Sequence, residues 1–179
     1  MSSKITSHIQ YALLPIIMVA CIFAAAAGGW WMVLVLLLPA LMATFVDELA
    51  GNQDEDGSYL AALLNFYLLS CLPCIALLSI VFGYYAGVGV LSGSIEAAFA
   101  MIGIDIAANK AATNTFEFAI GVLGAGMLLG AGATNVAHEL THRSNVRDYV
   151  VGRWLLAFTL DTTFAVSYTH LTLPTICSV

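Results

Sequence analysis

Charged residues are what this sequence has least of, since they make up only 9% of its 179 residues. A soluble domain is roughly 25% charged and about 45–50% apolar, whereas this chain is 61% hydrophobic. Its polar residues are too few to cover a water-soluble fold, so the composition excludes an ordinary soluble domain. Basic residues are especially scarce, with five Lys and Arg against eleven Asp and Glu, and nothing in the chain indicates a nucleic-acid partner.

Long stretches of the chain contain no Asp, Glu, Lys or Arg at all: residues 5–46, 57–95 and 118–137. A helix needs roughly 20 mostly apolar residues to cross the hydrocarbon core of a bilayer. The sequence therefore predicts an all-α, polytopic transmembrane protein whose immediate partner is the lipid bilayer. We expect about four complete spans, followed by a truncated C-terminal helical segment. The expected spans are residues 11–27, 30–46, 59–85 and 118–137.

Glycine marks both an expected turn and an expected close contact. Gly28-Gly29 interrupts the first apolar stretch and predicts the turn between the first two spans. In the fourth span Gly126 and Gly130 have the GxxxG spacing, with further glycines nearby at Gly121, Gly124 and Gly132. Such glycines let two membrane helices approach closely, so we expect this span to pack tightly against a neighbour.

The basic residues near the span ends predict the orientation of the chain. With four spans, one side receives Lys4, Arg143, Arg147 and Arg153, and the other receives Lys110. Lys and Arg are enriched on the cytoplasmic side of membrane proteins. We therefore expect the N-terminus, and the segment that follows the fourth span, to be cytoplasmic.

The segment after the fourth span begins with N-V-A-H-E-L-T-H-R-S-N, residues 135–145. Residues four apart lie on one face of an α-helix, so His138 and His142 can bind one metal ion together. The alternative is a pair of interfacial histidines that serve as hydrogen-bonding anchors. Because ionisable residues at membrane depth are costly and are functional candidates by default, we favour a metal site.

Two metal chemistries share this pattern. One is a zinc intramembrane protease of the H-E-x-x-H type, with Glu139 as general base. That chemistry needs a third ligand further on, and the segment from Arg143 to Asp148 contains no histidine. Asp161 is the candidate distant carboxylate, but two threonines follow it where such proteases usually show a glycine. The other chemistry is non-haem iron, which imidazole ligands also suit.

The flanking sequence favours iron. It runs A-T-N-V-A-H-E-L-T-H-R and then G-R-W-L-L-A-F-T-L-D-T-T-F-A-V. This combination resembles the integral-membrane alkane hydroxylases (alkane 1-monooxygenases), relatives of the membrane fatty-acid desaturases, whose first histidine box is H-E-L-x-H-K or H-E-L-x-H-R. The resemblance spans residues 10–166, including an acidic D-E-L-A-G-type turn after the second span. It implies that residues 1–166 are the N-terminal part of a hydroxylase/desaturase-like domain.

What the resemblance implies is an oxidoreductase of the bacterial inner (plasma) membrane. Its cytoplasmic non-haem di-iron centre would use O2 to hydroxylate the terminal carbon of an alkane or similar hydrocarbon chain. Electrons would come from a rubredoxin and its reductase. A fatty-acid desaturase of the same superfamily, acting on an acyl chain, is the close alternative.

The iron ligands implied by the resemblance are His138 and His142, and no residue is assigned a direct catalytic role. A ligating histidine usually donates its other ring N–H to a carboxylate or carbonyl group. Glu139 and Asp161 are therefore candidate carboxylate partners. For Asp161, a solvated charge near a helix end is an equally good interpretation.

The sequence departs from the family directly after T-T-F-A-V, where the second histidine box, E-H-x-x-G-H-H, should follow. Ser167 and Tyr168 stand where the glutamate and the first histidine belong, and residues 171–173 are Leu-Thr-Leu where Gly-His-His belongs. The final S-Y-T-H-L-T-L-P-T-I-C-S-V resembles translated sequencing-adapter DNA. We therefore expect residues 167–179 to be a non-native tail. Without the later boxes, we expect this chain to be inactive, whereas its full-length parent would be the enzyme.

Overall fold

The structure, a computed structural model, describes residues 2–46 and 61–160. All regular elements in this part of the chain are helices, which confirms the predicted all-α class. They are α1 (Ser2–Ala27), the short turn η1 (Gly29–Trp31), α2 (Met32–Leu41), η2 (Met42–Val46), α4 (Ala61–Tyr85), η3 (Gly89–Leu91), α5 (Ser92–Ala100), α6 (Ile106–Ala112), α7 (Thr115–Met127), η4 (Leu128–Ala133), α8 (Thr134–Thr141) and α9 (Val146–Phe158).

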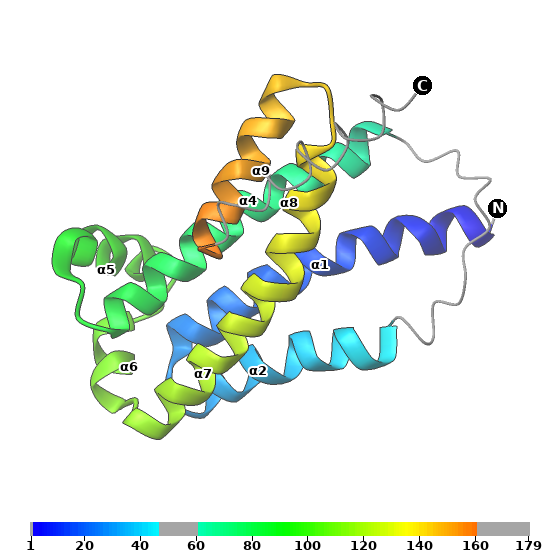
Figure 1. Cartoon of the computed structure of the whole chain (residues 1–179). Coiled ribbons are helices and arrows are strands. Elements are labelled where there is room, and N and C mark those ends of the chain that lie inside the picture. Colours follow the sequence, from blue (N-terminus) through cyan, green and yellow to red (C-terminus); the bar gives the residue numbers. More distant parts are fainter. Residues whose placement is uncertain (1, 47–60, 161–179) are drawn as a thin grey trace, which may run out of the picture.

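The long helices form a bundle in which neighbours in space are not always neighbours in sequence (Figure 1). The first two helices, α1 and α2, form a hairpin. Helix α7 packs against α2, α4 packs against α1, and α9 turns back against α8. Figure 1 places α5, α6 and the beginning of α7 at one end of the bundle, and the junction between α8 and α9 at the other.

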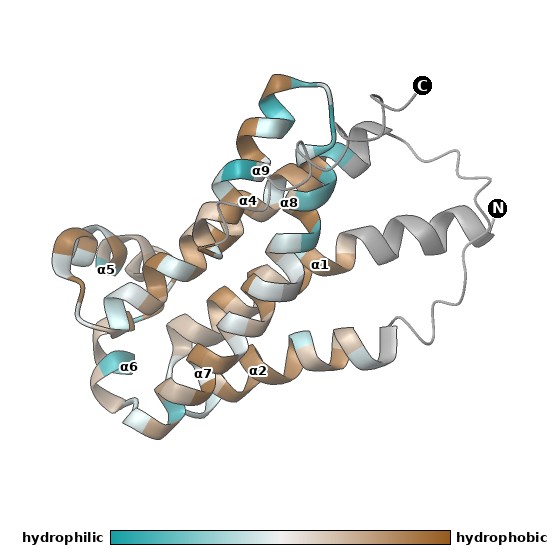
Figure 2. Cartoon of the chain, viewed as in Figure 1, coloured by the Kyte–Doolittle hydropathy of each residue, from teal (hydrophilic) through white to brown (hydrophobic). Residues whose placement is uncertain are grey.

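Two helical stretches in the described residues are long and apolar enough to cross a membrane, Asn65–Tyr85 and Thr115–Thr141. They correspond to the third and fourth expected spans. The other expected spans correspond to the apolar stretches Ala12–Ala27 and Gly29–Thr44, which are shorter. Figure 2 shows apolar residues along the long helices, and hydrophilic residues concentrated where α8 ends and α9 begins.

The turn predicted at Gly28-Gly29 is present and is tied to α6 and its C-terminal end. Gly28 has a φ of 64°, a left-handed conformation that favours glycine. The backbone N–H of Gly29 donates to Oγ1 of Thr113 at 2.7 Å, and Nδ2 of Asn109 donates to the carbonyl oxygen of Ala26 at 3.0 Å. These bonds hold the α1–α2 hairpin against a segment more than 80 residues further along the chain.

Helix α7, in the fourth expected span, does approach its neighbour closely, but not through the GxxxG pair. A Cβ atom at Gly124 would overlap the backbone of α2, and one at Gly121 would lie 2.6 Å from Sδ of Met32. At Gly126 and Gly130 an added Cβ would meet nothing within 4 Å. The expected close contact is therefore confirmed for the span but wrong for the GxxxG pair, because those two glycines point away from the neighbouring helices.

Candidate metal-binding site

His138 lies on α8 and His142 caps the C-terminal end of this helix. Helix α8 continues the membrane-length helix that begins with α7. The chain passes from α7 to α8 through the π-helical turn η4. A π-helical turn holds more residues than an α-helical turn and often occurs near functional sites. It changes the direction in which the side chains of α8 project, so it helps to decide where the histidines point.

The structure brings the two predicted ligands together. The rings of His138 and His142 have their centroids 4.7 Å apart and are tilted by 42°. Ala137 and Leu140 are buried on another face of α8, whereas His138 is half-buried and His142 is exposed. The predicted shared face is thus confirmed, and it is the more accessible face of the helix.

Glycine again sets the distance to the neighbouring helix. A Cβ atom at Gly152 in α9 would lie 3.0 Å from the carbonyl oxygen of Ala137 and 3.1 Å from Cβ of Leu140. Such contacts are tight, so Gly152 lets α9 lie close against α8. Helix α9 therefore packs at Gly152 directly against the helix that carries His138.

Glu139, predicted as a carboxylate partner of a ligating histidine, is engaged by an arginine. Its Oε1 lies 3.2 Å from Nη2 of Arg143, one helical turn further on, and it also accepts a hydrogen bond from Nε at 3.3 Å. Arg143 also forms an ion pair with Asp148 at 3.3 Å and donates to Oδ1 of Asn65. The other predicted carboxylate, Asp161, lies outside the described residues.

The sequence did not single out Asn65 and Asp148 as residues that contact Arg143. Asp148 carried a local signal, because it is the third residue after Asn145, which caps α9 by accepting a hydrogen bond from the backbone N–H of Arg147 at 3.0 Å. Acidic residues are favoured in the first turn of a helix. Asn65 carried no such signal, because it lies 78 residues before Arg143 in the sequence.

The donor set of the described residues supports a two-histidine metal site but not a complete centre. Two imidazoles four residues apart can bind one divalent ion. Within residues 2–46 and 61–160, no group of three or more His, Cys, Asp and Glu side chains is placed to hold a metal ion. The described residues alone therefore do not fit a di-iron centre, which needs further ligands.

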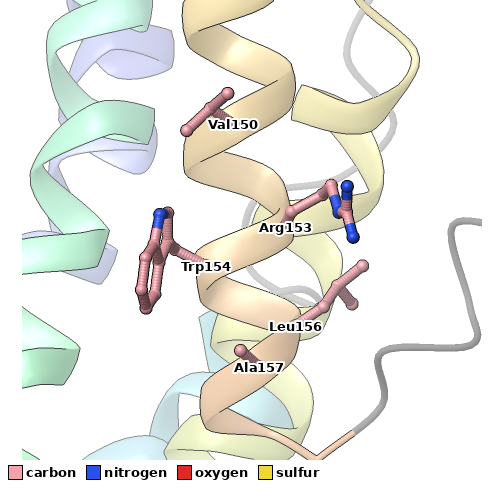
Figure 3. A pocket seen from close by; sticks show the side chains of 5 residues that line it. All are labelled: Val150, Arg153, Trp154, Leu156 and Ala157. Atoms are coloured by element: carbon pink, nitrogen blue, oxygen red, sulfur yellow. The ribbon is translucent and has the colours of Figure 1, made fainter.

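A pocket of about 330 Å³ lies on the neighbouring helix α9 and is separate from the histidines. Val150, Arg153, Trp154, Leu156 and Ala157 line it, and Figure 3 shows Trp154 projecting from the side of α9 opposite to Arg153 and Leu156. Of the predicted site residues that the structure describes, His138, Glu139 and His142, none lines this pocket.

Comparison with known proteins leaves the geometry of the site as the main guide to function. No protein-family model, no curated protein and no solved structure matches this chain.

Proposed function

We propose that this chain is the N-terminal part of a membrane non-haem di-iron monooxygenase that hydroxylates the terminal carbon of alkanes or similar hydrocarbon chains. One observation carries the proposal: His138 and His142, within H-E-L-T-H-R, lie with ring centroids 4.7 Å apart on an accessible helix face. That face lies at the end of the apolar stretch Thr115–Thr141, which is long enough to cross a bilayer. A metal site at this position can receive a hydrocarbon directly from the lipid.

In this proposal the chain crosses the bacterial inner membrane four times, with the N-terminus and the histidines on the cytoplasmic side. The arrangement of basic residues supports this orientation. Arg143 and Arg147 lie at the junction of α8 and α9, whereas Lys110 lies on α6, at the opposite end of the bundle (Figure 1). The excess of positive charge at the histidine end supports a cytoplasmic location for that end.

The remaining iron ligands belong to later histidine boxes of the parent protein. In this proposal His138 and His142 supply two imidazoles, and the parent receives electrons from a rubredoxin and its reductase. When bound, the iron pair supplies O2 activation. The 179-residue chain as written, with Ser167 and Tyr168 where the second box should begin, holds no stable di-iron centre and is inactive.

The contact between Glu139 and Arg143 counts against the zinc-protease alternative. A general base must face the metal-bound water and accept its proton. Here Oε1 of Glu139 is paired with Nη2 of Arg143 at 3.2 Å and also accepts a hydrogen bond from Nε of Arg143, so this oxygen is already engaged by a guanidinium group. A desaturase of the same superfamily uses the same metal chemistry, and nothing about the histidine pair favours one over the other.

The experiment that tests the proposal reads the source DNA through the codons that follow Val166. We expect them to encode E-H-x-x-G-H-H and, later, a third histidine box. The restored parent should then be expressed in membranes and assayed for bound iron and for O2-dependent hydroxylation of alkanes with a rubredoxin system. If the present final 13 residues, 167–179, are genomic and end the protein, the proposal fails. Stoichiometric iron in the purified 179-residue chain would overturn the expectation that this chain holds no stable di-iron centre.

A further inference from the structure

Three helices meet at the side chain of Arg143. Its guanidinium group donates to Oδ1 of Asn65 in α4, forms an ion pair with Glu139 in α8, and forms a second one with Asp148 in α9. The Arg143 side chain is 20% exposed and that of Asp148 is 11% exposed, whereas that of Glu139 is 58% exposed. The contacts with Asn65 and Asp148 are therefore partly buried, whereas the contact with Glu139 is exposed.

The position of Arg143 explains why this network concerns the histidines. Arg143 directly follows His142, at the point where α8 ends. Thr141 Oγ1 donates to the carbonyl oxygen of His138 at 2.9 Å, and the backbone N–H of Arg143 donates to the carbonyl oxygen of Leu140 at 3.3 Å. Helix ends fray unless their groups are held, so anchoring Arg143 also restrains the last turn of α8.

The shape of the arginine side chain suits this task. A guanidinium group offers five N–H donors in a rigid planar fork, whereas a lysine ammonium group is a compact point charge on a flexible stem. The Nε and Nη2 groups of Arg143 both contact Glu139, while Nη1 is shared by Asn65 and Asp148. A lysine would keep the charge but could not hold these three partners in one plane.

We propose that Arg143 is a positioning residue for the histidine pair: it joins α4, α8 and α9 and thereby holds His138 and His142 in the geometry that binds a metal ion. It does not bind the metal itself. The proposal goes beyond the one above and rests on it only in taking the two histidines as metal ligands. An isolated, exposed ion pair would contribute little to stability, but this partly buried network joins three helices at once.

The test measures Cu²⁺ binding to the full 179-residue chain in detergent, by titration and by electron paramagnetic resonance. The variants are Arg143→Lys and Arg143→Gln, and the matched control is Arg147→Gln, which removes an exposed arginine of the same junction. We expect both Arg143 variants to bind Cu²⁺ about 10–100-fold more weakly, as for other groups that orient metal ligands, and to give broadened spectra. The control variant Arg147→Gln should bind Cu²⁺ with the affinity and the spectrum of the wild type.

The sign of the effect separates positioning from simple electrostatics. If Arg143 acted only through its positive charge near a divalent cation, Arg143→Gln would bind Cu²⁺ more tightly, and Arg143→Lys would be unchanged. If Arg143 positions the histidines, both variants bind more weakly. Tighter or unchanged binding in Arg143→Gln would overturn the proposal.

Hydrogen exchange provides a second, metal-independent readout. In Arg143→Gln we expect faster amide exchange in the last turn of α8 and the first turn of α9, with no change where α2 packs against α7. Asp148→Asn, a milder change, should show a smaller effect in the same segments. If the wild type does not bind Cu²⁺, the metal-ligand role of the histidines fails, and this exchange pattern alone then decides whether Arg143 holds α8. Unchanged amide exchange in these segments would show that Arg143 does not hold the end of α8.

Discussion

The backbone of Gly124 in α7 lies directly against the backbone of Val35 in α2, so closely that a Cβ atom at residue 124 would overlap the Val35 carbonyl group. Because the clashing atoms belong to backbone, neither helix can yield by rotating a side chain. We predict that Gly124→Ala lowers the free energy of unfolding by about 1–3 kcal/mol, the usual cost of overpacking. Thermal unfolding of the purified protein in detergent measures this.

Gly126→Ala is the matched control for Gly124→Ala, since it lies in the same helix and an added Cβ meets nothing within 4 Å. Alanine favours a helix over glycine, so the control should be as stable as the wild type or slightly more stable. Equal destabilisation by both substitutions would contradict the observed packing of α7 on α2.

Gly28 should be the less replaceable of the two glycines in the α1–α2 turn. Both have positive φ, 64° for Gly28 and 53° for Gly29, so alanine is strained at either position. A Cβ at Gly28 would also lie 2.5 Å from Oγ1 of Thr113 and 2.6 Å from the hydroxyl oxygen of Tyr85, whereas one at Gly29 would meet nothing within 4 Å. We predict that Gly28→Ala is the more destabilising in a thermal melt, and the reverse order would refute this account of the turn.

The N-terminal end of α7 is closed by a reciprocal pair of hydrogen bonds. Oδ1 of Asn114 accepts from the backbone N–H of Glu117, and Oε2 of Glu117 accepts from the backbone N–H of Asn114, both at 2.9 Å. Glu117 is buried. Asn114→Ala should lower the free energy of unfolding by about 0.5–2 kcal/mol, the usual cost of losing a helix cap, as measured by thermal unfolding.

A glutamine can replace the glutamate of such a capping box. Glu117→Gln should therefore be nearly as stable as the wild type, whereas Glu117→Ala should resemble Asn114→Ala. If Glu117→Gln were as damaging as Glu117→Ala, the negative charge of Glu117, and not its hydrogen bond, would be the stabilising element.

The histidine pair should bind divalent metal ions through both rings at once. Losing a group that only orients a ligand costs about 10–100-fold in metal affinity, so losing a ligand should cost at least as much. We predict that His138→Ala and His142→Ala each weaken Zn²⁺ binding by at least about tenfold in calorimetric titrations. His8→Ala, which removes a histidine of the N-terminal helix α1 instead, serves as the control. If it weakened Zn²⁺ binding as much as the other two variants, the ion would not be bound at the α8 pair.

Local periodicity was enough to predict the pairing of the histidines. Residues four apart share a helix face, and His138 and His142 do so in the structure. A second local signal predicted the turn at Gly28, because a glycine pair interrupts an otherwise continuous apolar stretch there. Both features depend on residues that are neighbours along the chain.

Close contacts between helices could not be predicted in this way. The GxxxG spacing singled out Gly126 and Gly130, whereas Gly121 and Gly124 meet α2. Spacing shows which glycines share a face, but not which face turns toward a neighbour. That choice depends on how α1, α2, α4 and α7 pack together as a group.

Composition and spacing alone thus determine that this chain forms apolar helices and that two imidazoles share one helix face, because hydrophobicity and helical period are local properties. Packing determined what surrounds those imidazoles. Arg143 reaches Asn65, 78 residues earlier in the sequence, and Gly152 draws α9 against the histidine helix. Such contacts arise only when distant segments bury their apolar faces against one another, since burial is a property of the whole bundle and not of any one segment.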